Sequence, residues 1–266
     1  MDRRDILPER PVERGRGYMP GVSVNPSRIL FTAGLTGRNP DGSLVAGGMG
    51  PQTHRAFERL QAVLARALGK PKFEDGIKQL TYVTDLDAYN ADGRSERAKF
   101  FASTRTASTG LVVRRLADPA MLIEVELVVD VQGSPQGKPL LEKYNAEDHG
   151  GDFYQGVIVN GGRLIYLAGQ VANNPDGSVA GVGDLRRQAE KVYENIGHVL
   201  RAAGATPGSA VKETTWVLSI DTWRQQGTPV RRAFYNGAYP ASTLVEIQGL
   251  ARPEFLVEIE LIAAVA

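Results

Sequence analysis

The stretch ILFTAGLTGRNPDGSL at residues 29–44 recurs as LIYLAGQVANNPDGSV at residues 164–179, and the turn NPDGS is identical in the two copies. The upstream residues align at the same offset, since PGVSVN at residues 20–25 corresponds to QGVIVN at residues 155–160. A turn repeated by coincidence would not carry its flanking residues with it. The aligned flanks therefore indicate that the chain contains a duplicated domain.

The duplication continues through the rest of both halves. IKQLTYVTDLD at residues 77–87 aligns with VKETTWVLSID at residues 211–221. RLADPAMLIEVEL at residues 115–127 aligns with GLARPEFLVEIEL at residues 249–261. The chain of 266 residues therefore divides into two domains, each within the usual range of domain sizes.

The segments outside the repeat set the predicted domain boundaries. Residues 1–17 are rich in charge, Gly and Pro, which predicts a flexible N-terminal arm. Residues 132–151 have the Gly, Pro and polar composition of a linker. The first domain is therefore expected at residues 18–131 and the second at residues 152–266.

The composition excludes several classes of function. The net charge is +1, and the Lys and Arg residues are scattered, so we expect no nucleic-acid partner. The absence of cysteine excludes disulfides, thiolate metal sites and cysteine nucleophiles. The three histidines have no metal-ligand spacing, and no apolar run approaches the roughly 20 residues that span a bilayer. The expectation is a cytoplasmic protein with no metal site and no membrane partner.

Both halves have the same predicted order of elements. A strand at residues 29–33 or 164–168 leads through the NPDGS turn, whose Pro and Gly suit a tight turn, into an amphipathic helix. Gly69 is the predicted end of the first of these helices, and Asp184 is the predicted N-cap of the second. A strand, a second helix and two closing strands follow. Each half is therefore predicted as an α+β domain in which two helices cover one face of a mixed sheet.

The order and spacing of several short segments resemble the Rid family, also called YjgF-type or reactive intermediate/imine deaminases. These segments are AGQ at residues 168–170, VKETTWV at 211–217, YPAST at 239–243 and LVEIEL at 256–261. The resemblance covers nearly all of both halves. It implies a chorismate-mutase-like fold in which three domains assemble with their sheets inward and small-molecule sites lie in the clefts between domains. Because one chain supplies two domains, a homo-oligomer is expected, with a trimer favoured.

Glutamates on the closing strands are the first candidate site residues. Alternation places Glu124 and Glu126 on one face of one strand, and Glu258 and Glu260 on one face of the other. The same alternation is typical of a strand with one solvated face. By resemblance to the family, the first glutamate of each pair lines the pocket. Glu124 and Glu258 are therefore the predicted catalytic residues.

The arginine that binds the substrate carboxylate in the family's deaminases is missing from its usual place. In those deaminases it belongs to a PARS-like segment and forms a bidentate pair with the carboxylate. Ser108 and Ser242 occupy the matching positions here, in the segments TAST and PAST. Arg105 lies three residues too early to be the same group, although a loop shift would bring it near. We predict these three residues as substrate-binding positions, with poor activity on simple 2-imino acids.

The remaining candidates also follow from the resemblance. The family's pocket tyrosine corresponds to Tyr18 in the first half and to Phe153 in the second, with Tyr154 beside it. The backbone of Gly34 and Gly169, in the turn after the first strand, would position the substrate or a water molecule. A packing role is the commoner one for such a tyrosine. The two halves differ at these positions, which leaves open whether one cleft or both carry the chemistry.

The leading hypothesis is a cofactor-free hydrolase or deaminase for a small enamine, imine or related C–N substrate. In it, a strand glutamate orients water, and backbone amides with a serine hold the polar end of the substrate. The alternative is a metabolite-binding or interaction module that keeps the fold without the chemistry. A third possibility, ribonuclease activity, is disfavoured by the near-neutral charge.

Overall fold

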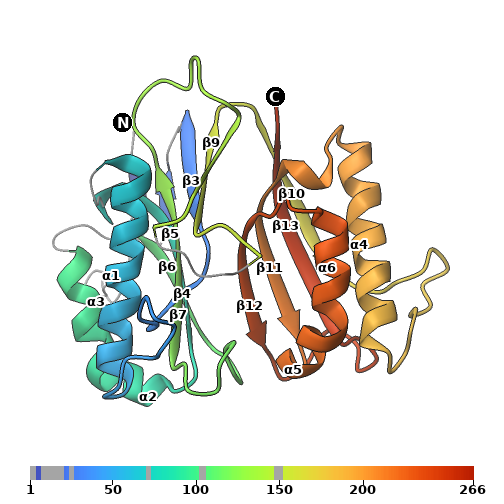
Figure 1. Ribbon diagram of the computed structural model, residues 1–266, viewed down its shortest axis with the longest axis horizontal. Helices are drawn as coiled ribbons and strands as arrows, with labels where there is room; N and C mark the ends of the chain where they lie inside the picture. The colour runs from blue at the N-terminus through green and yellow to red at the C-terminus, as the bar shows by residue number, and fades with distance from the viewer. Residues whose placement is uncertain (1–3, 7–20, 24–26, 70–72, 102–105, 147–151) are drawn as a thin grey trace.

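The computed structural model describes residues 4–6, 21–23, 27–69, 73–101, 106–146 and 152–266. They form two halves that lie side by side, with the helices on the two outer sides and the sheets between them (Figure 1). The sheet face that the helices of each half leave uncovered is thus turned toward the other half. This arrangement brings some of the candidate site residues of the two halves, among them Glu124 and Ser242, to one cavity.

The first half contains the predicted elements in the predicted order. Its strands are β1 (Arg4–Ile6), β2 (Gly21–Ser23), β3 (Arg28–Thr32), β4 (Leu35–Thr36), β5 (Gly76–Val83), β6 (Ala107–Val112) and β7 (Ile123–Asp130). Its helices are α1 (Met49–Leu68), the short η2 (Phe73–Asp75), α2 (Leu86–Ala88), the π-helical turn η3 (Tyr89–Gly93) and α3 (Arg94–Phe101).

The second half repeats this series. Its strands are β8 (Leu141–Tyr144), β9 (Gly156–Asn160), β10 (Arg163–Gln170), β11 (Ala210–Val217), β12 (Ala241–Glu246) and β13 (Val257–Val265). Its helices are α4 (Leu185–Ala202), the short η4 (Pro207–Ser209), α5 (Ile220–Thr222), the π-helical turn η5 (Trp223–Gly227) and α6 (Thr228–Tyr235). The π-helical turn occurs at the same place in both halves and was not predicted.

Each half has a mixed sheet. The first sheet has the strand order β6-β5-β7-β3-β9-β8, with β4 beside β7, and the second has the order β10-β13-β11-β12. In both, the strand after the first long helix pairs in parallel with the next strand and antiparallel with the closing strand. The prediction of two tandem α+β domains with mixed sheets is confirmed.

Hydrogen bonding crosses the predicted boundary between the domains. By the sequence repeat, β9 belongs to the second half, but it pairs with β3 of the first from Arg28–Asn160 to Thr32–Gly156. Strand β8, which lies inside the predicted linker 132–151, pairs with β9 and extends the same sheet. The chain passes from the first sheet to the second at Gly161 and Gly162, both of which have positive φ angles. Residue 152 as the boundary stays a prediction.

The repeated NPDGS turn has a structural explanation. In the first copy, Asp41 accepts hydrogen bonds from the backbone and side chain of Ser43, and Gly42 has a φ of 85°. In the second copy, Asp176 and Ser178 make the same bonds, and Gly177 has a φ of 82°. Glycine is favoured at that φ because it lacks a Cβ. The predicted helix signals are also confirmed, with Asp184 capping α4 and Gly69 ending α1.

Helices and sheets pack through apolar faces in each half. The outer face of α1 is polar, and its inner face contributes Phe57, Leu60 and Leu64 to a cluster with the first sheet. Helix α4 packs on the second sheet in the same way through Val192, Tyr193 and Ile196. Burial of such side chains stabilises a fold by roughly 1.5–3 kcal/mol each.

A third cluster joins the halves. Phe31 and Ala33 of the first half pack with Val211, Ala241 and Ala264 of the second in one buried cluster. It lies where the two sheets face each other (Figure 1), so the relative position of the halves is fixed by apolar contact.

Candidate active site

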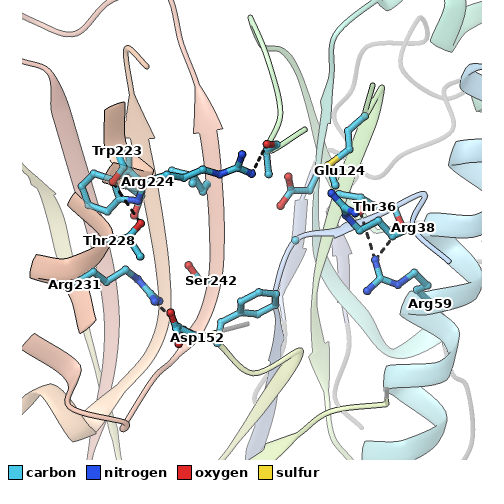
Figure 2. Close-up of a pocket in the computed structure, with 16 residues that line it drawn as sticks. Thr36, Arg38, Arg59, Glu124, Asp152, Trp223, Arg224, Thr228, Arg231 and Ser242 are labelled. Carbon is cyan, nitrogen blue, oxygen red and sulfur yellow. Dashed lines mark hydrogen bonds between the residues drawn. The ribbon is translucent and has the colours of Figure 1, made fainter. Parts of the chain in front are cut away.

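A cavity of about 340 Å³ lies between the two halves. Figure 2 shows Glu124 on the first-half side and Ser242 on the second-half side. The cavity is lined by Gly34, Thr36, Arg38, Arg59, Ala117, Met121, Glu124, Asp152, Phe153, Thr215, Trp223, Arg224, Thr228, Arg231, Ser242 and Leu244. A concave site of this size suits a small molecule.

Among the acids that line this cleft, Glu124 has the most strongly shifted pKa. It lies on β7 between Thr36 of β4 and Tyr82 of β5, and its side chain is only 5% exposed. Burial raises the pKa of Glu124 to about 8, whereas the nearby Lys212 and Arg59 act in the opposite direction. A carboxyl group with this pKa is mostly protonated at pH 7 and can donate a proton.

Gly34 makes room for the Glu124 carboxyl group. A Cβ added to Gly34 would lie 1.7 Å from Oε1 of Glu124, which is far inside van der Waals contact. The Gly34 N–H also donates a hydrogen bond of 3.2 Å to the backbone oxygen of Ser242. Gly34 therefore positions Glu124 and joins the two halves at the cleft.

Gly34→Ala should displace the Glu124 side chain, because the new methyl group occupies the place of Oε1. We expect at least about a tenfold loss of any Glu124-dependent activity, since small misplacements of a catalytic group are costly. Steady-state kinetics of the variant measure the loss. Gly110→Ala is a matched control, because a Cβ there meets no atom within 4 Å. Full activity in Gly34→Ala would show that the position of Glu124 is unimportant.

Arginine side chains from both halves line the cavity that holds Glu124. Arg59 of α1 donates hydrogen bonds to the backbone and side-chain oxygens of Thr36, as Figure 2 shows. Arg224 donates to the backbone oxygen of Ala117 in the other half, at 2.5 Å. With Glu124 protonated, these cations make the cleft electropositive.

Arg231 of α6 is the most buried of these arginines. Its Nε pairs with Glu213 at 2.5 Å, and its Nη1 donates to the backbone oxygen of Asp152 at 2.8 Å. The hydroxyls of Tyr193 and Tyr235 also donate to Glu213. Among the residues that the structure describes, none accepts a hydrogen bond from the buried Nη2 of Arg231. Burial lowers the pKa of Arg231, but the charge of Glu213, the neighbouring tyrosines and the hydrogen bond to Glu213 together raise it by more, so the guanidinium group is charged.

The structure brings together four of the predicted site residues and separates others from them. Glu124, Gly34, Phe153 and Ser242 all line the cleft. Tyr154 lies beside Ala241 and under the ammonium group of Lys143, and it is not among the lining residues. Tyr18 and Arg105 lie outside the described residues.

A second glutamate and glycine pair lies away from the cleft. A Cβ added to Gly169 would be 1.9 Å from Oε1 of Glu258, which repeats the arrangement of Gly34 and Glu124. Glu258 is half-buried, and Ser108 lies on β6 in the other half. Neither Glu258 nor Ser108 lines the cavity between the halves. The predicted roles of these residues stay predictions.

Sequence reasoning missed the arginines and Trp223. They come from the loop after β4, from helices α1 and α6 and from the π-helical turn η5, and only the fold brings them to the cavity that holds Glu124. One signal was present, because Arg97 and Arg231 stand at the same distance before the AST segments of β6 and β12. Arg97 donates to Gln79 as Arg231 does to Glu213. The same spacing in both halves indicates that the two arginines occupy equivalent positions in the repeated domain.

The described part of the chain contains no cluster of three or more His, Asp or Glu side chains arranged to hold a metal ion. None of its helices combines the length and apolarity required to cross a bilayer.

Comparison with known proteins identifies the family. The model of the family described as Endoribonuclease L-PSP matches residues 12–131 and again residues 146–265. A 2-iminobutanoate/2-iminopropanoate deaminase of Rattus norvegicus is 29% identical over 111 residues, covering 38% of this chain and 80% of the relative. Protein DfrA of Myxococcus xanthus is 32% identical over 113 residues, covering 42% of this chain and 85% of the relative.

Solved structures include a Rid-family protein of unknown function, YyfB from Yersinia pestis. It is 36% identical, with a TM-score of 0.42, and the match covers 48% of this chain and all of that one. The two matches to the family model cover most of the sequence. The chain therefore belongs to the Endoribonuclease L-PSP, or Rid, family and carries two tandem copies of the family's domain.

Proposed function

We propose that this protein is a cofactor-free hydrolase that deaminates a small imine, enamine or related C–N substrate in the cleft between its halves. The observation that carries the proposal is the buried Glu124 carboxyl group, whose pKa is raised to about 8 in a cavity of about 340 Å³. The deaminases among its relatives, at low identity, support the same reaction type.

Glu124 can serve in each of the four proton transfers of imine hydrolysis. Its neutral carboxyl group donates a proton to the imine nitrogen, and the resulting carboxylate takes a proton from the water that adds to the carbon. The same group then protonates the nitrogen of the carbinolamine. When the C–N bond breaks, ammonia leaves, and the carboxylate takes the proton of the hydroxyl group. Imine and water thus give a carbonyl compound and ammonia, with Glu124 regenerated.

The other side of the cleft would hold the polar end of the substrate. Ser242, half-buried on β12, offers a hydroxyl group opposite Glu124 (Figure 2). Arg231 lies on the same side and carries a positive charge. A serine in place of the family's arginine suits a neutral or differently charged substrate better than a simple 2-imino acid.

An imine-trapping assay tests the proposal. An amino-acid oxidase generates 2-imino acids, a flavin amine oxidase generates neutral imines from amines, semicarbazide traps both, and the protein is added to compete for them. We expect a lower trapped signal with one or more imines, and a larger effect with neutral imines than with 2-imino acids. If no imine of either class is lost faster, the proposed reaction is wrong, and binding without catalysis, favoured by the serine at both arginine positions, becomes the function to test.

We also propose that the protein acts in the cytoplasm as a homo-oligomer. The absence of cysteine fits a reducing compartment. A trimer is the assembly that the family resemblance favours. Sedimentation equilibrium gives the number of chains directly.

A further inference from the structure

A buried polar cluster joins the two halves beside Glu124. At its centre, Glu126 of β7 forms an ion pair with Lys212 of β11 in the second half. The Glu126 carboxylate also accepts hydrogen bonds from Tyr82 at 3.2 Å and from Thr243 at 2.8 Å. Lys212 donates a further hydrogen bond of 2.5 Å to Thr243. All four residues of the cluster are at most 7% exposed, so its charges interact in a medium of low polarity.

The strand geometry brings this ion pair within electrostatic reach of Glu124. Glu124 and Glu126 stand two residues apart on β7, so their side chains share the sheet face that is turned toward the second half. Positions two residues apart along a strand are separated by roughly 7 Å. A charge at that distance shifts the pKa of a buried carboxyl group by roughly one to two units.

Charged or ionisable groups face Glu124 from several elements: Glu126 on β7, Tyr82 on β5, Arg59 on α1 and Lys212 on β11. Burial raises the pKa of Tyr82 far above its ordinary value, so Tyr82 is neutral. The pKa of Glu124 is raised by burial, lowered by Lys212, raised by Glu126 and lowered by Arg59, in decreasing order of effect. Lys212 is thus the cation that most opposes burial, and it comes from the other half. The other charged residues that line the cavity are Arg38, Asp152, Arg224 and Arg231.

We infer that Lys212 is a positioning residue of the proposed reaction: its ammonium group, held by Glu126 at the contact between the halves, stabilises the carboxylate that Glu124 becomes when it gives its proton to the substrate. The inference rests on the proposed function for its consequence in catalysis, but the charge interaction does not. A buried carboxyl group with no cation near it holds its proton tightly. Lys212 eases the transfer, and Glu126 limits this effect because it partly neutralises the cation.

The first half contains the equivalent lysine at a greater distance from Glu124. Lys78 corresponds to Lys212 in the repeat and donates a hydrogen bond of 2.5 Å to Thr109. It stands on β5 opposite Val128, four residues along β7 from Glu124. Four strand residues span roughly 13 Å, so the half-buried Lys78 acts on Glu124 much more weakly. Lys78 is therefore a matched control.

NMR titration of the Glu124 carboxyl carbon tests the inference without a substrate. Protein labelled with ¹³C at the glutamate carboxyl groups is titrated from about pH 5 to about pH 10, and the Glu124 signal is assigned by its loss in Glu124→Gln. In Lys212→Met, the pKa of Glu124 should rise by about one unit, because a stabilising cation is removed. In Glu126→Gln it should fall, because a repelling carboxylate is removed. Lys78→Met should leave it unchanged.

A double variant keeps the test valid where a single variant folds poorly. Lys212→Met and Glu126→Gln each leave a buried charge without its partner, which destabilises the fold. Lys212 still has a carboxylate nearby in Glu126→Gln, because its charge also acts on Glu260. The double variant removes both charges, and circular dichroism should show that it folds. Its Glu124 pKa should lie above the wild-type value but below that of Lys212→Met, because the effect of Lys212 exceeds that of Glu126.

The outcomes separate this inference from the proposed function. An unchanged Glu124 pKa in Lys212→Met and in the double variant, or an equal rise in Lys78→Met, would overturn the inference while leaving the reaction intact. In an active protein, the pH at which kcat/KM falls should move upward in Lys212→Met and downward in Glu126→Gln, whereas a merely structural role would lower the rate without moving it. A wild type that hydrolyses no imine, with the NMR shifts as described, would refute the proposed reaction and support the charge interaction.

Discussion

Glu124→Gln should lower kcat/KM for imine hydrolysis by about 10²- to 10⁴-fold, the usual contribution of a positioned general acid or base. Glutamine has nearly the same shape as the protonated carboxyl group, so it fits against Gly34 without disturbing the cleft. It cannot transfer a proton. The loss should therefore appear in kcat, with an unchanged circular dichroism spectrum.

Glu258→Gln is the matched control for this prediction. Glu258 stands at the equivalent position, but it does not line the cavity between the halves. The variant should keep about half or more of the wild-type rate, because effects at separate sites are close to independent. If Glu124→Gln retains wild-type kcat/KM, or if Glu258→Gln alone abolishes activity, the assignment of the cleft is wrong.

Arg231→Met should destabilise the fold by about 3–5 kcal/mol, because it leaves a buried charge without its partner. Arg231 is 7% exposed, and Glu213, its ion-pair partner, is fully buried. The tyrosine hydroxyls that remain around Glu213 can donate hydrogen bonds but carry no positive charge. Urea unfolding followed by circular dichroism measures the change in the free energy of unfolding.

The first half supplies the control. Arg97→Met removes the equivalent arginine, whose partner Gln79 is neutral, so the cost should be only roughly 1–3 kcal/mol. The comparison isolates the charge of Glu213, because the two arginines have equivalent positions in the repeat. Equal losses in the two variants would mean that the ion pair contributes nothing beyond hydrogen bonding.

Much of the fold could be predicted because the turn, cap and strand signals depend on neighbouring residues and because the repeat shows most of them in both halves. The NPDGS turns and the cap at Asp184 depend on neighbouring residues, and alternation along β7 and β13 fixes which side chains share a face. The exchange of β9 into the first sheet could not be predicted. The apolar residues of β9 would fit into either sheet, and the packing of the two halves against each other decides which sheet the strand joins.

The candidate site was predictable only in part. Glu124 and Gly34 lie in repeated motifs, so the resemblance pointed to them. Arg59 and Arg231 lie on helices far along the chain, and amphipathic spacing does not tell a surface arginine from one that reaches a cleft. Glu124 and Glu258 stand at equivalent positions of the repeat, so the sequence does not show which of them lines the cavity. That depends on which sheet faces of the two halves meet within one chain.

The pH dependence of kcat/KM between pH 5 and 10 tests the central claim most directly, because kcat/KM reports the pKa values of the free enzyme. The protonated form of Glu124 is the donor, and burial raises its pKa to about 8. The value of kcat/KM should therefore be constant below that pH and fall about tenfold per pH unit above it. The pH profile of Glu124→Gln should lack this fall. A kcat/KM that already falls about tenfold per pH unit from pH 5 upward, as the ordinary glutamate pKa of about 4.3 would give, or one that rises through pH 8, would contradict the account.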